Sequence, residues 1–302
     1  MQLYSDPTCR QLVQTAAEKF GVETDEILFT NGSDEALNFA FMAFCDPEHP
    51  AVFPDITYGF YPVFAVLNGI PFETIPLKDD FSIAIHDYLG IEKNIFLANP
   101  NAPTGLALSK SDIERIVESN PHHVVVVDEA YVDFGAESCI DLIHQYDNIL
   151  VCGTFSKSRS LAGGRLGFAV GNKNLIADLN TVKFSTNPYN VNRMTMAAGI
   201  GALCDESYFK NNCKAIMETR EWAAKELKKL GFMLTDSVAN FLFAKHPNIA
   251  GKELYLLLKQ KGVLIRHFET DRLQDYNRIT VGSLEQMQVL LAKVKEILEE
   301  RT

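Results

Sequence analysis

The sequence predicts an α/β protein with a mostly parallel central sheet, followed by a smaller C-terminal α+β region. Over the first 170 residues, short apolar runs alternate with helical patterns. These runs are continuously apolar, which is typical of strands that helices cover on both faces. Beyond about Asn192 the pattern changes to amphipathic helices separated by short strands. Ligands of such sheets bind at the carboxyl ends of the strands, so motifs that follow strands are the first candidates for a site.

Caps and apolar runs predict the elements of the first region. A helix is expected from Cys9 to Phe20, because Gly21 is a common C-cap residue. A strand at Ile27–Thr30 leads into an apolar helix that ends at Cys45, and a further helix is expected from Tyr58 to Asn68. The other expected strands are Pro71–Ile75, Ile95–Ala98, Val124–Asp128, Ile149–Gly153 and Leu166–Val170.

The second region is predicted to contain four helices and three strands. Its expected elements are helices Arg193–Cys204, Glu206–Leu230 and Lys252–Lys261, strand Asn240–Lys245, two short strands around Arg266 and Arg278, and a helix from Leu284. We therefore expect a large domain over residues 1–191 and a small domain over residues 192–302 that includes linking helices.

Composition narrows the class of protein. The chain has 302 residues, a net charge of −11 and a pI near 5.1, which argues against non-specific binding to nucleic acid or an anionic membrane. No signal peptide is recognisable, and the longest apolar runs are too short to span a bilayer. The six cysteines form no CxxC pair and no metal-ligand spacing, and GxGxxG, GxxxxGK[ST] and HExxH are absent. We expect a reduced, cytoplasmic enzyme without a metal.

A carboxylate and a lysine follow two successive predicted strands. Asp128 ends a run of four valines, and Lys157 lies just past the next strand. A buried carboxylate is costly unless it is paired. A lysine can hold pyridoxal phosphate as an imine, and a carboxylate can keep the pyridine nitrogen of that cofactor protonated. The pair therefore indicates a pyridoxal phosphate site.

The alternative is that Lys157 is an ordinary solvated surface lysine. The neighbouring side chains argue against this, because hydroxyls and a guanidinium suit a phosphate monoester. These neighbours are Thr154, Ser156 and Arg165, with Arg159 as a competing candidate for the guanidinium.

Two further motifs precede predicted helices. The turn Asn31–Glu35 offers a glycine and free N–H groups that can hold a phosphate, although Ser33 or Asp34 could simply cap the helix. Tyr58 lies beside a glycine and could stack on a flat ring, although an aromatic residue at such a place more often packs in the core.

Polar residues also follow strands elsewhere in the chain. The turn Asn99–Gly105 offers an asparagine amide to a phenolic oxygen, and a cis bond before Pro103 is possible; the alternative is an ordinary loop with Asx turns. Tyr131 could reach the same oxygen. Arg266 and Arg278 could clamp a carboxylate or phosphate, or could form surface ion pairs.

Taken together, these motifs carry a family resemblance. NGSDEAL, TYGFYP, NPNAPTG, VVDEAY, TFSKSRSLAGGRLGF, PYNVNR and RITVG occur in the order and spacing of one family. The chain resembles, over essentially its whole length, the fold-type I pyridoxal phosphate aminotransferases, and most closely the histidinol-phosphate aminotransferase family. No single motif would suffice, but the ordered set is specific.

The resemblance implies a role for each candidate. Lys157 would be the Schiff-base lysine, and Asp128 would contact the pyridine nitrogen. The remaining implied contacts are Tyr131 and an NPNAPTG asparagine on the ring oxygen, Tyr58 stacked on the ring, Ser33 and Asp34 (through backbone), Thr154, Ser156 and Arg165 on the phosphate, Arg266 and Arg278 on the acidic ends of the substrates, and Tyr4 on the cofactor phosphate of a partner subunit.

The chain departs from the family at two places. Ala102 stands where the family usually has asparagine before Pro-Thr-Gly, so we assign the asparagine role to Asn101, with Asn99 as the alternative. Leu3–Pro7 matches a stretch that an N-terminal arm precedes in the family, so that arm, which helps to cover the site and form the dimer, is expected to be missing.

The resemblance implies a homodimer that interconverts L-histidinol phosphate plus 2-oxoglutarate with imidazole acetol phosphate plus L-glutamate. The alternatives are a phosphothreonine decarboxylase or an aromatic aminotransferase of the same fold. A third alternative is a pyridoxal phosphate-binding protein that is inactive because it lacks the arm.

Overall fold

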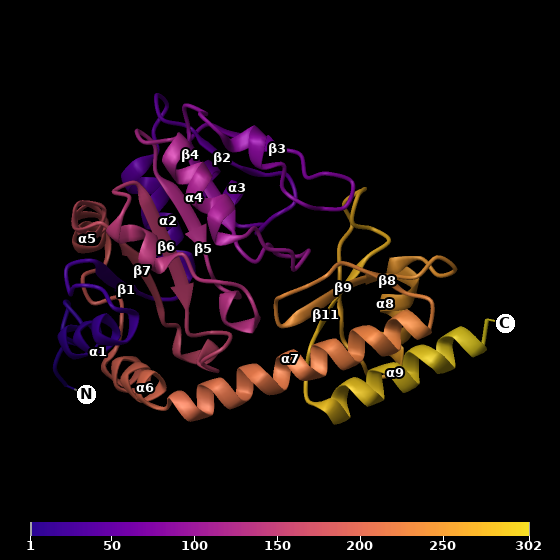
Figure 1. Ribbon diagram of the computed structural model, residues 1–302. Coiled ribbons are helices and arrows are strands. Elements are labelled where there is room, and N and C mark those ends of the chain that lie inside the picture. The colour runs from indigo at the N-terminus through magenta and orange to yellow at the C-terminus, as the bar shows by residue number, and fades with distance from the viewer. Residues whose placement is uncertain (1, 302) are drawn as a thin grey trace.

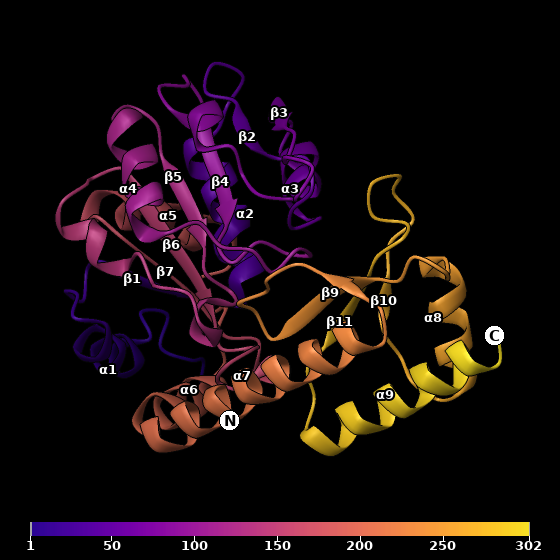
Figure 2. The same ribbon diagram turned by 45° about the vertical axis from the view of Figure 1, so that its right-hand side comes forward.

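Two β-sheets lie at opposite ends of the molecule, and one long helix runs beneath both (Figure 1). The computed structural model describes residues 2–301. The connecting helix is α7 (Glu206–Lys229), which begins beside the large sheet and ends beside the small one (Figures 1 and 2).

The large sheet has seven strands in the order β1-β7-β6-β5-β4-β2-β3. Only β7 runs against the others, since it pairs antiparallel with both of its neighbours. The prediction of a mostly parallel sheet is therefore confirmed. The strands are β1 (Ile27–Thr30), β2 (Ala51–Pro54), β3 (Phe72–Ile75), β4 (Asn94–Ala98), β5 (Val125–Asp128), β6 (Ile149–Thr154) and β7 (Gly167–Gly171).

Helices cover both faces of this sheet, which explains its continuously apolar strands. Along β5, Val125 and Val127 belong to one hydrophobic core and Val126 to the other. The helices of this part of the chain are α1 (Arg10–Phe20), α2 (Ser33–Phe44), α3 (Tyr61–Leu67), α4 (Lys110–Ser119), α5 (Lys173–Thr186) and α6 (Arg193–Cys204). Its 3₁₀ turns are Ile85–Tyr88, Val132–Phe134, Ile140–His144 and Ala162–Gly164.

The small sheet is antiparallel, in the order β10-β11-β9-β8. Its strands are β8 (Met233–Leu234), β9 (Phe241–Lys245), β10 (Arg266–His267) and β11 (Asn277–Thr280), and it packs with α7, α8 (Gly251–Gln260) and α9 (Leu284–Glu299) (Figure 2). Between residues 2 and 301, no helix combines the length and the apolar character that crossing a membrane requires.

Helix boundaries differ from the prediction in two informative places. The helix expected from Tyr58 begins only at Tyr61, because Pro62 has no N–H to donate and is tolerated only in the first turn. Neither Ser33 nor Asp34 caps α2; the N-cap residue is Gly32, and no side chain bonds the helix start. By contrast, Gly21 ends α1 with φ 71°, as expected.

Candidate active site

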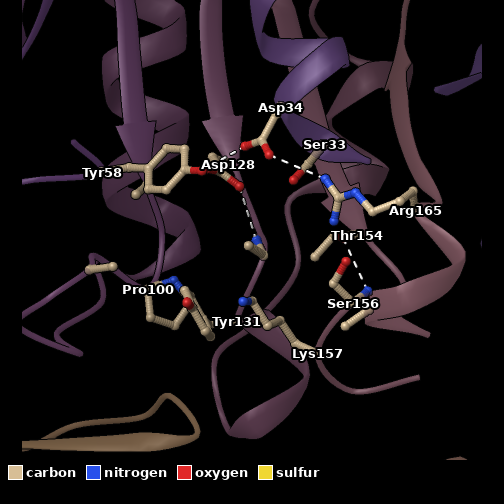
Figure 3. A pocket seen from close by; sticks show the side chains of 14 residues that line it. Ser33, Asp34, Tyr58, Pro100, Asp128, Tyr131, Thr154, Ser156, Lys157 and Arg165 are labelled. Atoms are coloured by element: carbon tan, nitrogen blue, oxygen red, sulfur yellow. Dashed lines mark hydrogen bonds and ion pairs between the residues drawn. The ribbon is translucent and has the colours of Figure 1, made fainter. Parts of the chain in front are cut away.

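A pocket opens at the carboxyl ends of β4, β5 and β6, beside the first turn of α2 (Figure 3). Strand ends of neighbouring parallel strands meet at one edge of a sheet, and this edge gathers motifs that lie far apart in the chain. Predicted residues that line the pocket are Ser33, Asp34, Tyr58, Asp128, Tyr131, Thr154, Ser156, Lys157 and Arg165.

Asp128 is a buried acid that faces this pocket at the end of β5. Its Oδ2 accepts a hydrogen bond of 3.2 Å from the Tyr61 hydroxyl, and its Oδ1 accepts one of 3.1 Å from the Ala130 N–H. Burial raises the pKa of Asp128 to about 6. No ion pair reaches it from residues 2–301 in the structure. A cationic N–H in the pocket would supply the missing partner.

Lys157 lies in the loop after β6 and points into the pocket (Figure 3). Its Nζ is 5.3 Å from the centre of the Tyr131 ring. That ring packs edge-on against Phe241, with centroids 5.1 Å apart. On the far side of the loop, the Ser158 hydroxyl donates to the carboxylate of Asp133. The Tyr131 ring and the loop that carries Lys157 are thus held by neighbours outside the pocket.

The other end of the pocket is built for an anion. The N–H groups at the start of α2 have no side-chain cap, and Thr154, Ser156 and Arg165 face the same space. Two glycines allow Arg165 and strand β7 to lie close to the start of α2. A Cβ on Gly32 would lie 2.4 Å from Nη2 of Arg165, and a Cβ on Gly167 would lie 2.3 Å from the Ser33 nitrogen. A phosphate monoester fits this set of donors.

Tyr58 forms a wall of the pocket, and its hydroxyl donates a 2.6 Å hydrogen bond to Asp34. Burial, together with this hydrogen bond, raises the pKa of Tyr58 well above its ordinary value. Asp34 also lies 3.3 Å from Nη2 of Arg165. No sequence motif pointed to a role for Tyr61, but its ring lies edge-on to that of Tyr58, with centroids 5.7 Å apart.

Neither asparagine of the NPNAPTG turn lines the pocket; Pro100 and Ala102 do. The Asn101 amide donates to the Ile56 carbonyl at 2.9 Å and to Thr104, and its oxygen accepts from Thr57. The Asn99 side chain bonds the backbone of Leu108. The peptide bonds before Pro100 and Pro103 are both cis.

Two other candidates lie away from the pocket. Tyr4 is exposed, stacks on Tyr189 at 4.6 Å, and its carbonyl accepts from Arg193. Arg159 donates to the Ala202 carbonyl and lies over the ring of Phe209. Arg165, the other candidate for the guanidinium, is the one that reaches the pocket.

Arg266 and Arg278 line a second cavity that shares Tyr58 and Ala102 with the first. They are direct cross-strand partners on β10 and β11. Like charges opposite each other repel, and neither arginine forms an ion pair with a carboxylate of residues 2–301. The Arg278 Nε is buried without a hydrogen-bond partner. An acidic ligand between them would relieve the repulsion.

The family model for aminotransferase class I and II matches residues 1–294. The chain belongs to this family. It is 47% identical over 300 residues to a histidinol-phosphate aminotransferase of Brachyspira hyodysenteriae and 48% identical over 302 residues to one of Aromatoleum aromaticum, covering 99% of this chain and 85% of each relative. A crystal structure of a putative histidinol-phosphate aminotransferase from Erwinia carotovora atroseptica is 27% identical and superposes with a TM-score of 0.90, covering 99% of this chain and 88% of that one.

Pyridoxal phosphate is the cofactor of this aminotransferase family, and the residues of the pocket fit it. The anion cradle at α2 suits the phosphate of the cofactor, and the unpaired carboxylate of Asp128 suits a protonated ring nitrogen. Lys157 lines the same pocket.

Proposed function

We propose that the chain transfers the amino group of L-histidinol phosphate to 2-oxoglutarate and yields imidazole acetol phosphate and L-glutamate, a reaction of histidine biosynthesis. One observation carries this proposal above the others: the pocket with Asp128 and Lys157 adjoins a cavity that is lined by two cross-strand arginines, Arg266 and Arg278. The names of the relatives, which this chain matches over 99% of its length, support the same substrate.

Pyridoxal phosphate supplies an electron sink for the carbanion at the substrate Cα. The residues of the chain do the rest. Asp128 would hold the proton on the ring nitrogen, and Tyr131 would donate to the ring oxygen. Tyr58 would cover one face of the ring. The backbone of Ser33 and Asp34 and the side chains of Thr154, Ser156 and Arg165 would hold the phosphate. The amine of Lys157, in its neutral form, would take the proton from the substrate Cα.

Arg266 and Arg278 are assigned to the acidic ends of the two substrates. One substrate ends in a phosphate and the other in a carboxylate, and a pair of guanidinium groups can donate hydrogen bonds to either. The cross-strand register of the two arginines, neither of which pairs with a carboxylate of residues 2–301, supports this assignment.

The proposal includes a homodimer in the cytoplasm, with a large domain around the seven-stranded sheet and a small one around the four-stranded sheet. An exposed apolar face near the pocket supports the dimer, because such patches mark interfaces. It consists of Phe60, Val63, Val66 and Leu67, which are 49% to 71% exposed. In such a dimer Tyr4 would reach the cofactor phosphate of the partner subunit.

The test is an amino-transfer assay with the purified protein and pyridoxal phosphate. L-histidinol phosphate, O-phosphothreonine and phenylalanine are each offered with 2-oxoglutarate, and both glutamate and CO₂ are measured. Glutamate formed fastest from histidinol phosphate supports the proposal. CO₂ from phosphothreonine, fastest turnover of phenylalanine, or cofactor binding without any turnover would each replace it.

A further inference from the structure

Arg220 of α7 is a buried cation at the junction of the two sheets. The residue is 7% exposed. Its Nη1 donates to the Phe134 carbonyl at 2.7 Å and to the Ala239 carbonyl at 2.8 Å. Phe134 belongs to the turn of the large sheet that follows Tyr131, and Ala239 leads into β9 of the small sheet. One side-chain nitrogen therefore ties the two parts of the molecule together.

Packing alone does not account for a cation at this position. No carboxylate of residues 2–301 forms an ion pair with Arg220, and burial lowers its pKa. An apolar side chain of similar length could fill the same space without the cost of desolvating a charge. What an apolar side chain could not do is hold two carbonyls of separate segments at one point.

Both tied segments lead directly to the active site. On one side, the turn Val132–Phe134 closes on Tyr131, because the Phe134 N–H donates to the Tyr131 carbonyl at 3.3 Å. On the other side, Ala239 lies two residues before Phe241. The ring of Phe241 contacts the Tyr131 ring edge-on, and the guanidinium of Arg278 lies over it at 5.1 Å.

We propose that Arg220 is a positioning residue that fixes Tyr131, and with it the ring-oxygen contact, at a set distance from Arg278. It touches neither cofactor nor substrate and acts through two backbone carbonyls. This inference rests on the proposed function for its kinetic consequence, but its effect on Tyr131 needs only that the cofactor binds. The two can therefore be tested apart.

The experiment compares Arg220→Met and Arg220→Lys with the wild-type holoenzyme. Lys214→Met is the matched control, because Lys214 is an exposed lysine on the same helix. The pH titration of the visible absorption of bound pyridoxal phosphate reports on the ring-oxygen contact. Steady-state kinetics with histidinol phosphate give kcat and KM. Fluorescence of Trp222, the one tryptophan of the chain, reports whether α7 is folded.

Arg220→Met is expected to shift the titration midpoint and to lower kcat/KM about 10- to 100-fold, the loss expected for a charged hydrogen bond. Arg220→Lys keeps the charge on a shorter side chain and should fall between Met and wild type. Lys214→Met should match wild type in all readouts. If Arg220→Met does not fold, the shift of the titration midpoint in Arg220→Lys tests whether Arg220 positions Tyr131.

A folded Arg220→Met or Arg220→Lys variant with wild-type midpoint, kcat and KM would overturn the inference, even if its melting temperature were lower. If the wild type binds pyridoxal phosphate but does not turn over histidinol phosphate, the proposed function fails. The titration midpoint then still tests the role of Arg220.

Discussion

Asp128→Asn is expected to stabilise the cofactor-free protein while it abolishes the function. Burial raises the pKa of Asp128 from 3.8 to about 6, so the folded state resists its ionisation. A pKa difference of this size corresponds to about 3 kcal/mol. The folded state holds the proton more tightly than the unfolded state, so wild-type stability falls as the pH rises from about 4 to about 6. At pH 7.5 the full cost is present.

Asparagine removes this cost because it carries no charge, and its amide oxygen can still accept from Tyr61 or Ala130. The unfolding free energy of the cofactor-free variant at pH 7.5 should therefore exceed that of wild type, by up to about 3 kcal/mol. Its holoenzyme should lose at least about 100-fold in kcat/KM, because the ring nitrogen loses its counter-charge. Urea denaturation without cofactor and steady-state kinetics with it measure the two effects.

Glu129→Gln is the matched control. Burial also raises the pKa of Glu129, to about 7, but this carboxylate is directed at Ser138 and the Cys139 N–H rather than at the pocket. Its replacement should relieve a similar cost and leave kcat/KM within a few-fold of wild type. Asp128 would not be the buried counter-charge of the ring nitrogen if the cofactor-free Asp128→Asn protein were less stable than wild type at pH 7.5, or if its holoenzyme kept its activity.

Three further substitutions test other parts of the site. Gly167→Ala places a Cβ 2.3 Å from the backbone at the start of α2, so it should destabilise the fold by about 1–3 kcal/mol and weaken cofactor binding. The control Gly163→Ala meets no atom within 4 Å and should have neither effect. Thermal unfolding and cofactor titration measure the two effects. Arg278→Gln should raise KM for histidinol phosphate about 10-fold or more with a smaller change in kcat, and an unchanged KM would remove Arg278 from the substrate site. Tyr61→Phe removes a hydrogen bond that lowers the pKa of Asp128. The variant should therefore bind the cofactor about 10-fold more weakly, and the acidic limb of its pH–rate profile should move to higher pH. A profile that does not move would count against this contact.

Much of the fold could be predicted because local chemistry specifies it. The valine run before Asp128 is apolar on both faces because two separate cores bury it. Gly21 ends α1 because it adopts a left-handed conformation at low cost. The arginine pair could be placed on two short strands, although its cross-strand register became visible only in the structure.

The remaining features depend on tertiary contacts that no local pattern encodes. Asn101 looks like a ligand by its position in the motif, but Ile56, Thr57 and Thr104 occupy its side chain. Tyr61 looks like a core aromatic, and only the packing of α3 against the sheet brings its hydroxyl to Asp128. Arg220 lies on a charged helix and reads as a surface residue until the second sheet closes over it.

The proposed function requires that the chain carries an amino group from histidinol phosphate to 2-oxoglutarate. The most direct measurement uses histidinol phosphate labelled with ¹⁵N in its amino group, the holoenzyme and unlabelled 2-oxoglutarate, with mass spectrometry of the products. We expect ¹⁵N in glutamate, equimolar imidazole acetol phosphate, and no transfer by Lys157→Ala. Unlabelled glutamate only, or labelled glutamate formed equally well by Lys157→Ala, would contradict it.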